Sequence, residues 1–279
     1  MQKRLITDEI VQDFSQYLLH EEKAAATCEK YLRDVKKFML FAEGRNVTKE
    51  LIVEYKMVCL KAGYAIRSIN SMIASINSLM TFLNWLDCRV KSFKIQQQTF
   101  CSEEKELTKK EYLRLLEASK GDEQMNLLLQ SMASTGIRVS ELKFFTVEAI
   151  RNKEVTIHNK GKIRTILIPG KLKKRLLDYA RKKKIKSGAI FVSKNKKDLD
   201  RSNIWKKMKK LCEKAKVKSS KVFPHNLRKL FARCFYKLEK DIAKLADLLG
   251  HSSINTTRIY IMDSGVEHLQ QLEKLRLII

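Results

Sequence analysis

The sequence predicts a mainly α-helical protein of two domains, with one small β-hairpin in the C-terminal domain. Apolar residues recur at helical spacing from near the N-terminus to about Cys88, and this periodicity disappears over residues 90–106. Helical patterns then resume, with a single change to alternating spacing. The 279 residues, 44% of them hydrophobic, are enough to fill two cores. We therefore expect a helical domain at 1–89, a linker at 90–106 and a second domain at 107–279.

Four helices account for the first domain. Thr7, Thr27 or a near neighbour, and Thr48 are the expected N-terminal caps, because a hydroxyl accepts a backbone N–H of the first turn. The last helix carries Ser and Asn among its apolar residues. These polar side chains could contact a phosphate backbone or face solvent outside a bundle, and the sequence favours neither alternative. The helices are expected near residues 8–20, 25–43, 48–62 and 65–86.

The second domain begins with helices and then changes period. Thr108 and Glu111 have the spacing of a capping box before an amphipathic helix. "EQMNLLLQSMASTG" predicts a buried helix that ends at Gly136, and "IRVSELKFF" is expected to begin another. In residues 154–169, "EVTIHNKGKIRTILIP", two alternating runs flank the turn-like tetrapeptide 159–162, which predicts a β-hairpin.

The rest of the chain is expected to be mostly helical again. "HSSINTTR", residues 251–258, is expected to be a loop, because it lacks residues that pack rigidly. Amphipathic helices are predicted over 171–185, 202–215, 225–238 and 240–250, with a short strand at 189–192 and a final helix from about Val266.

The charge of the chain points to a polyanionic partner. Against 31 Asp and Glu, 57 Lys and Arg give a net charge of +26. Residues 1–98 hold 15 basic and 11 acidic residues, so most of the excess lies in the C-terminal part. Nucleic acid is the first candidate partner, and a lysine-rich solubilising surface is the alternative.

Several classes of protein are disfavoured. The cysteines are scattered without a CxxC pair, and the N-terminus does not resemble a signal peptide, so we expect reduced thiols and neither a disulfide framework nor a metal site. No apolar run approaches the roughly eighteen residues of a membrane span. We expect a cytoplasmic protein without a cofactor. The cysteines are Cys28, Cys59, Cys88, Cys101, Cys212 and Cys234.

Two short motifs place arginines near helix N-termini. In "PHNLR", Pro224 precedes His225 and Arg228, which share one face of a predicted helix start, where an anion is favoured. In "STGIRVSEL", Arg138 follows the end of one predicted helix, and Glu141 could hold it by an i, i+3 ion pair. Taken alone, the first motif is equally consistent with solvated surface charges, and the second is more simply explained as a solvated surface pair.

Two further motifs hold a lysine, a histidine and a tyrosine. Lys160 lies on the predicted hairpin turn, where an exposed lysine is ordinary. His251 precedes Tyr260 by nine residues in "LLGHSSINTTRIYI". Because Ile259 and Ile261 flank it, Tyr260 taken alone is more simply explained as a core aromatic.

The joint order of these motifs resembles the tyrosine recombinase (phage integrase) family, which includes Xer-type recombinases and transposon integrases. The matching segments are "TGIRVSEL", "NKGKIRTILIP", "HNLRKLFA" and "LLGHSSINTTRIYI", within residues 134–261. The N-terminal helices resemble the family's core-binding domain. The resemblance implies a two-domain, C-shaped clamp on double-stranded DNA. It also implies a site-specific recombinase (integrase) that works through a 3′-phosphotyrosyl intermediate without ATP or metal.

The resemblance assigns Tyr260 as the nucleophile. A phenolate leaves more readily than an alkoxide, so the covalent step is reversible. Arg138 and Arg228 would hold the phosphate oxygens with planar, permanently charged groups. Glu141 matches the acidic residue that orients the family's site.

The resemblance also assigns the proton transfers. Lys160 would protonate the departing 5′ oxygen, although Lys162 in the same turn is a rival for this role. His225 would assist proton removal from the tyrosine, and His251 would hydrogen-bond the phosphate. The sequence departs from many relatives at Lys229, where they carry a second histidine.

The C-terminal segment "GVEHLQQLEKLRLII" resembles the helix that relatives dock on a neighbouring subunit, which implies a homotetramer on paired sites. Its apolar stripe could instead pack on its own domain. The stripe consists of Val266, Leu269, Leu272 and Leu275.

Two other functions remain as alternatives, a type IB topoisomerase-like enzyme and a non-catalytic DNA-binding regulator. The chain starts directly with the core-binding helices, which favours an Xer-like enzyme or a small mobile element. A cytoplasmic, nucleoid-associated location would follow. The sequence leaves open the target DNA and the choice among integration, excision, inversion and dimer resolution.

Overall fold

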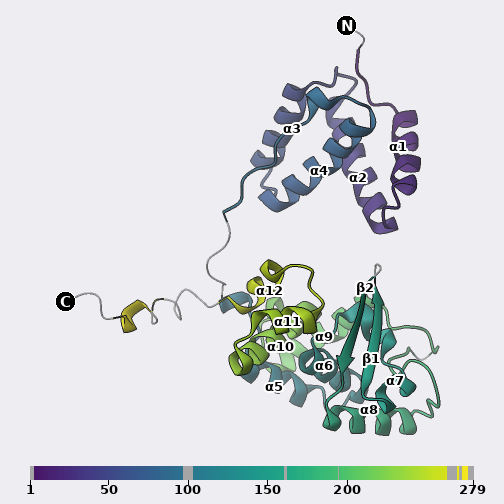
Figure 1. The fold of residues 1–279 in the computed structure, drawn as a ribbon, viewed down its shortest axis with the longest axis vertical. Coiled ribbons are helices and arrows are strands. Elements are labelled where there is room, and N and C mark those ends of the chain that lie inside the picture. The colour runs from purple at the N-terminus through teal and green to yellow at the C-terminus, as the bar shows by residue number, and fades with distance from the viewer. Residues whose placement is uncertain are drawn as a thin grey trace. The chain divides into compact units, whose positions relative to one another are not determined.

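The structure is a computed structural model, in which the chain forms two compact units, residues 1–97 and 98–279. Each unit has its own hydrophobic core. Figure 1 traces both units from the N-terminus to the C-terminus. The structure describes residues 3–96, 103–159, 162–193, 195–262, 269 and 272–275.

The first unit confirms the four predicted helices. Thr7 and Thr48 cap α1 and α3, and each hydroxyl accepts a backbone N–H of the first turn at 3.3 Å. The second helix begins after Ala24 without a side-chain cap, and Thr27 lies inside its first turn. A short 3-10 helix follows at Leu86–Cys88. The four helices are α1 (Asp8–His20), α2 (Ala25–Ala42), α3 (Lys49–Lys61) and α4 (Ile66–Phe82).

The polar residues of α4 hold the chain that follows it. Asn77 donates to the Val90 carbonyl at 2.8 Å and accepts the Val90 N–H at 3.1 Å. Asn70 pairs with the backbone of Phe93 in the same way, at 2.9 and 2.8 Å. Ser75 is fully buried inside the unit. The described structure therefore gives these side chains an internal role, and it packs the first residues of the expected linker on α4.

The second unit surrounds one central helix. In Figure 1, α6 lies among α5, α8, α9 and α10, and its apolar residues fill the core. The elements are 3-10 helices at Glu103–Lys105, Val139–Phe144 and Ser219–Lys221, and α5 (Lys109–Ala118), α6 (Glu123–Thr135), α7 (Val147–Arg151), β1 (Glu154–Asn159), β2 (Lys162–Leu167), α8 (Gly170–Lys182), α9 (Arg201–Ala215), α10 (Pro224–Glu239), α11 (Ile242–Leu249) and α12 (Ile254–Ile261).

Local signals located several of these ends correctly. Thr108 and Glu111 form the predicted capping box of α5. Gly136 ends α6 in the left-handed region, at φ 63°. The hairpin is antiparallel, and its last described pair is Asn159 with Lys162. The two residues between them lie outside the described residues.

Three local predictions are wrong. Residues 189–192 form isolated bridges instead of a strand. Arg138 is extended, and the expected α-helix after it is the 3-10 helix Val139–Phe144. Residues 251–258 are only partly a loop, because Ser253 caps α12, which starts at Ile254 and continues through Tyr260. The short helix α7 was not predicted.

The structure describes the predicted C-terminal helix only in part. Of the final helix expected from about Val266, only residues 269 and 272–275 are described. Within the described residues, no helix combines the length and the apolar character needed to cross a membrane. Five of the cysteines are described as free thiols; Cys28, Cys59, Cys88 and Cys212 are buried, and Cys234 is exposed.

Candidate active site

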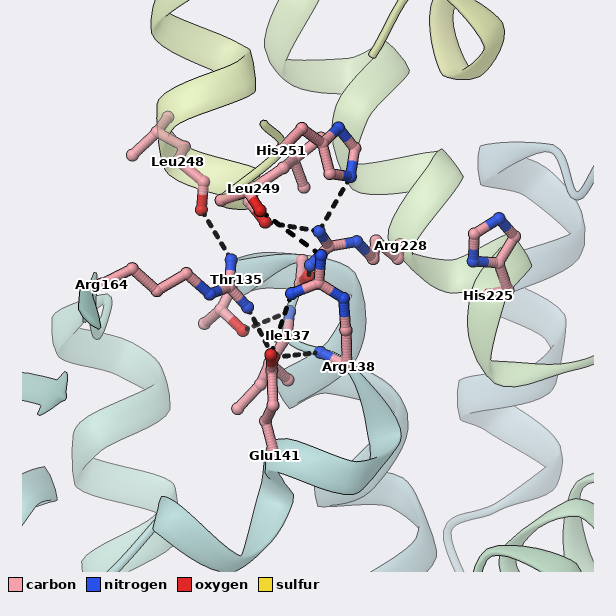
Figure 2. Close-up of polar contacts among 12 residues, drawn as sticks. Thr135, Ile137, Arg138, Glu141, Arg164, His225, Arg228, Leu248, Leu249 and His251 are labelled. Carbon is pink, nitrogen blue, oxygen red and sulfur yellow. Dashed lines mark hydrogen bonds and ion pairs between the residues drawn. The ribbon is translucent and has the colours of Figure 1, made fainter. Parts of the chain in front are cut away.

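The C-terminal turn of α11 holds the guanidinium groups of three arginines (Figure 2). The last carbonyls of a helix lack intrahelical partners and carry the negative end of its dipole, so they attract cations. Three consecutive carbonyls of this turn each accept from a different arginine. The pairs are Arg164 with Leu248 at 3.0 Å, Arg228 with Leu249 at 2.5 Å, and Arg138 with Gly250 at 3.5 Å.

A buried carboxylate, Glu141, neutralises part of this charge. One of its oxygens accepts from Nη1 of Arg138 at 2.9 Å. The other accepts the backbone N–H of Arg138 at 2.9 Å and Nη2 of Arg164 at 2.5 Å. Burial alone would raise the pKa of Glu141, but the Arg138 hydrogen bonds and the Arg164 charge outweigh it, so the pKa is lowered. Glu141 is therefore ionised and bridges Arg138 and Arg164, and it is not a solvated surface partner of Arg138.

Arg228 is a buried cation with only 2% of its surface exposed. Its Nη1 donates to the Gly136 carbonyl, and its Nη2 faces Nε2 of His251 at 3.0 Å. The buried Nε has no hydrogen-bond partner. Burial, followed by the charges of the two neighbouring arginines, lowers the pKa of Arg228 to about 10.

His251 is held as a neutral ring. An arginine only donates, so Nε2 of His251 must accept from Arg228, and Nδ1 donates to Oγ1 of Thr257 at 2.8 Å. The pKa of His251 is lowered to about 4, first by burial and then by the charges of Arg228, Arg138 and Arg164. This ring therefore carries its proton on Nδ1 at neutral pH.

Tyr260 is 7% exposed, and its hydroxyl lies 3.5 Å from Nδ1 of His225. Its ring stands edge-on to both His225 and His251, with centroids 5.0 Å apart in each case. Burial, followed by the charges of Lys229 and Arg228, lowers the pKa of His225. A neutral His225 can accept the phenol proton. Tyr260 is therefore buried, but its hydroxyl faces a possible proton acceptor.

The start of α10 explains where His225 and Arg228 lie. Pro224 occupies the first helical position, where its missing N–H costs nothing. His225 follows in the first turn, and Arg228 lies one turn later on the same face. Lys229 on the neighbouring face forms an ion pair with Glu106 at 3.6 Å.

The structure thus brings together the predicted residues Arg138, Glu141, His225, Arg228, His251 and Tyr260. Lys160 lies outside the described residues, and Lys162 begins β2. Sequence reasoning missed Arg164. An available signal was the alternation of β2, which puts this arginine on the same face as the buried Ile166.

Two family models match segments of the two units. Residues 105–265 match the Phage integrase family, and residues 11–86 match the "Phage integrase, N-terminal SAM-like domain". The tyrosine recombinase XerA of Pyrococcus furiosus is 31% identical over 291 residues, covering 99% of each chain. The XerA of Pyrococcus horikoshii is 30% identical, covering 99% of this chain and 96% of the relative.

Solved structures support the same fold. The crystal structure of a lambda integrase (75–356) dimer bound to a COC′ core site has a TM-score of 0.74 at 17% identity, covering 93% of this chain and 96% of that one. A crystal structure of XerA recombinase has a TM-score of 0.55 at 24% identity, covering 98% and 100%. The family-model match and the XerA relatives show that the chain belongs to the phage integrase family of tyrosine site-specific recombinases.

Proposed function

We propose that this recombinase cuts and rejoins duplex DNA by transesterification at Tyr260. The phenol oxygen attacks the scissile phosphorus, the bond to the 5′ oxygen breaks, and a 3′-phosphotyrosyl link forms. A 5′-hydroxyl from the partner strand then attacks this link and restores Tyr260. Each step exchanges one phosphate ester for another, so neither ATP nor a metal ion is required. The observation that carries this proposal is the Tyr260 hydroxyl facing His225 beside three clustered arginines.

His225 acts as the base in the first step. Its lowered pKa keeps the ring neutral, and its Nδ1 is the nitrogen that faces the phenol at 3.5 Å. Apo hydrogen bonds of this length commonly tighten when substrate binds. The phenol proton therefore moves to Nδ1 of His225 as the oxygen attacks.

Arg138 and Arg228 stabilise the charge on the phosphate. The Arg138 side chain is 37% exposed, so its guanidinium is available to a non-bridging oxygen. Arg228 adds a buried positive charge next to it. His251 lies between this arginine and Tyr260, where a phosphate would lie within its reach. The negative charge of the phosphate would favour a proton on Nε2, and Nε2 would then donate a hydrogen bond to the transition state instead of accepting from Arg228.

The leaving 5′ oxygen needs a proton, and the hairpin turn supplies it. Lys160 is the proposed acid, by its match to the family's hairpin lysine, and Lys162 is its rival two residues later. A lysine on a turn can reach into a DNA groove without disturbing the hairpin core.

The substrate is double-stranded DNA, in keeping with the net charge of +26. A core-binding domain at 1–89 and a catalytic domain at 107–279, joined by the linker 90–106, would close on it as a C-shaped clamp. Phosphate contacts would dominate the affinity, so binding weakens steeply with added salt. Such a protein works on the chromosome or on a mobile element, in a nucleoid-associated location.

Covalent capture on randomised DNA tests this function whatever the target sequence is. The protein is incubated with 40-bp duplexes of randomised sequence, each nicked so that the fragment beside the scissile phosphate diffuses away. Adducts that survive denaturing detergent are collected and sequenced. We expect enrichment of one sequence and a link to Tyr260, with no adduct from Tyr260→Phe. Absence of any adduct from the unmodified protein would exclude the recombinase mechanism.

The capture experiment separates a regulator from an enzyme, and two further assays, plasmid relaxation and strand exchange, separate a topoisomerase from a recombinase. A DNA-binding regulator would enrich a sequence without forming a covalent link. A type IB topoisomerase would relax supercoiled plasmid as a monomer and would not exchange strands between two captured sites.

The C-terminal segment is proposed to dock on a neighbouring subunit. Leu269, Leu272 and Leu275 are 56%, 52% and 57% exposed, an apolar stripe that the described part of its own unit leaves uncovered. A lambda integrase tetramer bound to a Holliday junction is among the similar structures, with a TM-score of 0.73. Replacing the three leucines by serine should abolish tetramers on junction DNA, measured by light scattering, and leave monomer folding intact.

A further inference from the structure

We propose that Arg164 is a positioning residue of the recombination reaction. It ties Glu141 to the turn that carries His251, and it thereby fixes Arg138 against the phosphate. The inference rests on the proposed function, because it assigns a role within the same site. It concerns a residue that lies inside the matching segment 159–169 but is not among the assigned catalytic residues.

Arg164 connects two elements through separate nitrogens. Its Nη2 donates to Glu141 at 2.5 Å, and its Nη1 donates to the Leu248 carbonyl at 3.0 Å. The guanidinium is rigid and planar, so these two bonds fix the separation of the carboxylate from the turn. With 12% of its side chain exposed, Arg164 is mostly shielded from DNA.

The bridge acts on Arg138 through a shared carboxylate. Glu141 accepts from both arginines, so its position is set from two sides. Without Arg164, the carboxylate could follow the more exposed Arg138 side chain, and the Leu248 carbonyl would lose its partner. Both ends of the phosphate site, Arg138 and His251, would then gain freedom of movement.

The turn and Arg164 also fit together sterically. A Cβ on Gly250 would lie 2.5 Å from Cδ of Arg164, well inside contact distance. Gly250 also adopts φ 62°, a conformation that glycine tolerates best. The buried Nε of Arg164 has no hydrogen-bond partner, and an unpaired buried donor destabilises the fold. The other contacts of Arg164 nevertheless hold the group in this place. The turn before His251 is therefore built against the arginine.

The test compares Arg164→Met and Arg164→Lys with a control at a more exposed arginine, Arg175→Met. Arg175 is also a bridging arginine of this unit, and it donates to Gln130 at 2.7 Å and to Asn126 at 3.1 Å. Two readouts are used. The first is the single-turnover rate of adduct formation at saturating DNA, together with the half-saturating DNA concentration. The second is amide hydrogen exchange of the peptide over residues 248–252, measured without DNA.

For Arg164→Met we expect a rate about 10- to 100-fold lower, because small misplacements of reacting groups are costly, and a half-saturating concentration within about twofold of the original. Exchange over residues 248–252 should speed up. Lysine keeps the charge but its single nitrogen cannot span both acceptors, so Arg164→Lys should recover only part of the rate. Arg175→Met should leave both readouts unchanged.

Three outcomes would overturn the proposal. An unchanged rate for Arg164→Met would remove the positioning role, and a change in DNA affinity alone would make Arg164 a DNA contact. Equal losses in Arg164→Met and Arg175→Met, with equal drops in melting temperature, would indicate general support of the fold. If the unmodified protein forms no adduct, the proposed function fails, and the exchange measurement still decides whether Arg164 holds the turn.

Discussion

The phenol oxygen of Tyr260 lies 3.5 Å from Nδ1 of His225, and the two rings stand at 89° to each other. Nδ1 can accept the phenol proton when the neutral ring carries its own proton on Nε2. In the proposed mechanism this pair joins the nucleophile to its base, and the two residues come from two helices, α12 and α10. Tyr260 is consequently both part of a small apolar cluster and part of the site.

The first prediction concerns pH and His225. Its pKa is lowered, chiefly by burial, so the neutral base persists below the ordinary pKa of about 6.5. Cleavage by the unmodified protein should stay constant on acidification past that value and fall only at lower pH. His225→Gln should slow cleavage by about 10²- to 10⁴-fold and should lose this acidic limb. Single-turnover rates across pH measure both, and an unchanged rate in His225→Gln would contradict the assignment.

The second prediction concerns the stability of the fold. His251 has a pKa of about 4 in the folded protein, against about 6.5 when unfolded. Between these values the unfolded chain binds more protons, so stability is full above the upper value and is lost as pH falls through the lower one. Urea unfolding at several pH values measures this loss. His251→Asn should flatten the dependence, and a variant with the same slope would refute it.

The same histidine should respond to phosphate. His251 lies among the positive charges of Arg228, Arg138 and Arg164. Its ring packs edge-on against Tyr260, and His225 lies nearby. A bound phosphodiester adds negative charge, so the pKa of His251 should rise when DNA binds. Histidine NMR titration with and without DNA, in the Tyr260→Phe variant to prevent cleavage, measures the direction. A pKa that stays near 4 with DNA bound would count against direct contact.

The third prediction isolates the close approach of Gly250 to Arg164. Gly250→Ala combines backbone strain with a steric clash, whereas Gly44→Ala places alanine at φ 72° with nothing within 4 Å. Gly44→Ala should cost about 1 kcal/mol of unfolding free energy, and Gly250→Ala about 1–3 kcal/mol more. When both are measured against Arg164→Ala as the reference, adding Gly250→Ala should cost little more than adding Gly44→Ala. Equal costs for the two glycines would show that the clash relaxes freely.

The fourth prediction distinguishes Lys160 from Lys162. A DNA substrate with sulfur in place of the scissile 5′ oxygen releases a thiolate, which needs no general acid. The alanine variant of the true acid should cleave ordinary DNA slowly and should recover on the sulfur substrate. The alanine variant of the other lysine should show no such rescue. If neither variant is rescued, the acid lies elsewhere in the site.

Much of the fold follows from local sequence signals. Thr7, Thr48 and the Thr108 capping box mark helix starts, and Gly136 marks a helix end, because each acts on backbone groups a few residues away. The prediction of a loop at residues 251–258 was wrong because it depended on burial that the local sequence does not show. Thr257 is fully buried and pairs with His251, a contact that its hydroxylated neighbours do not reveal.

The sequence by itself determined the two helical regions, the hairpin, the order of the motifs and six of the residues that meet in the site. Only the tertiary structure decided what orients them. Arg164 reaches Leu248 across 84 residues, and Arg138 reaches Gly250 across 112. Caps and periodicity act over a few residues, whereas the carbonyls that hold these guanidinium groups become neighbours of the arginines only when α11 packs against β2 and α10.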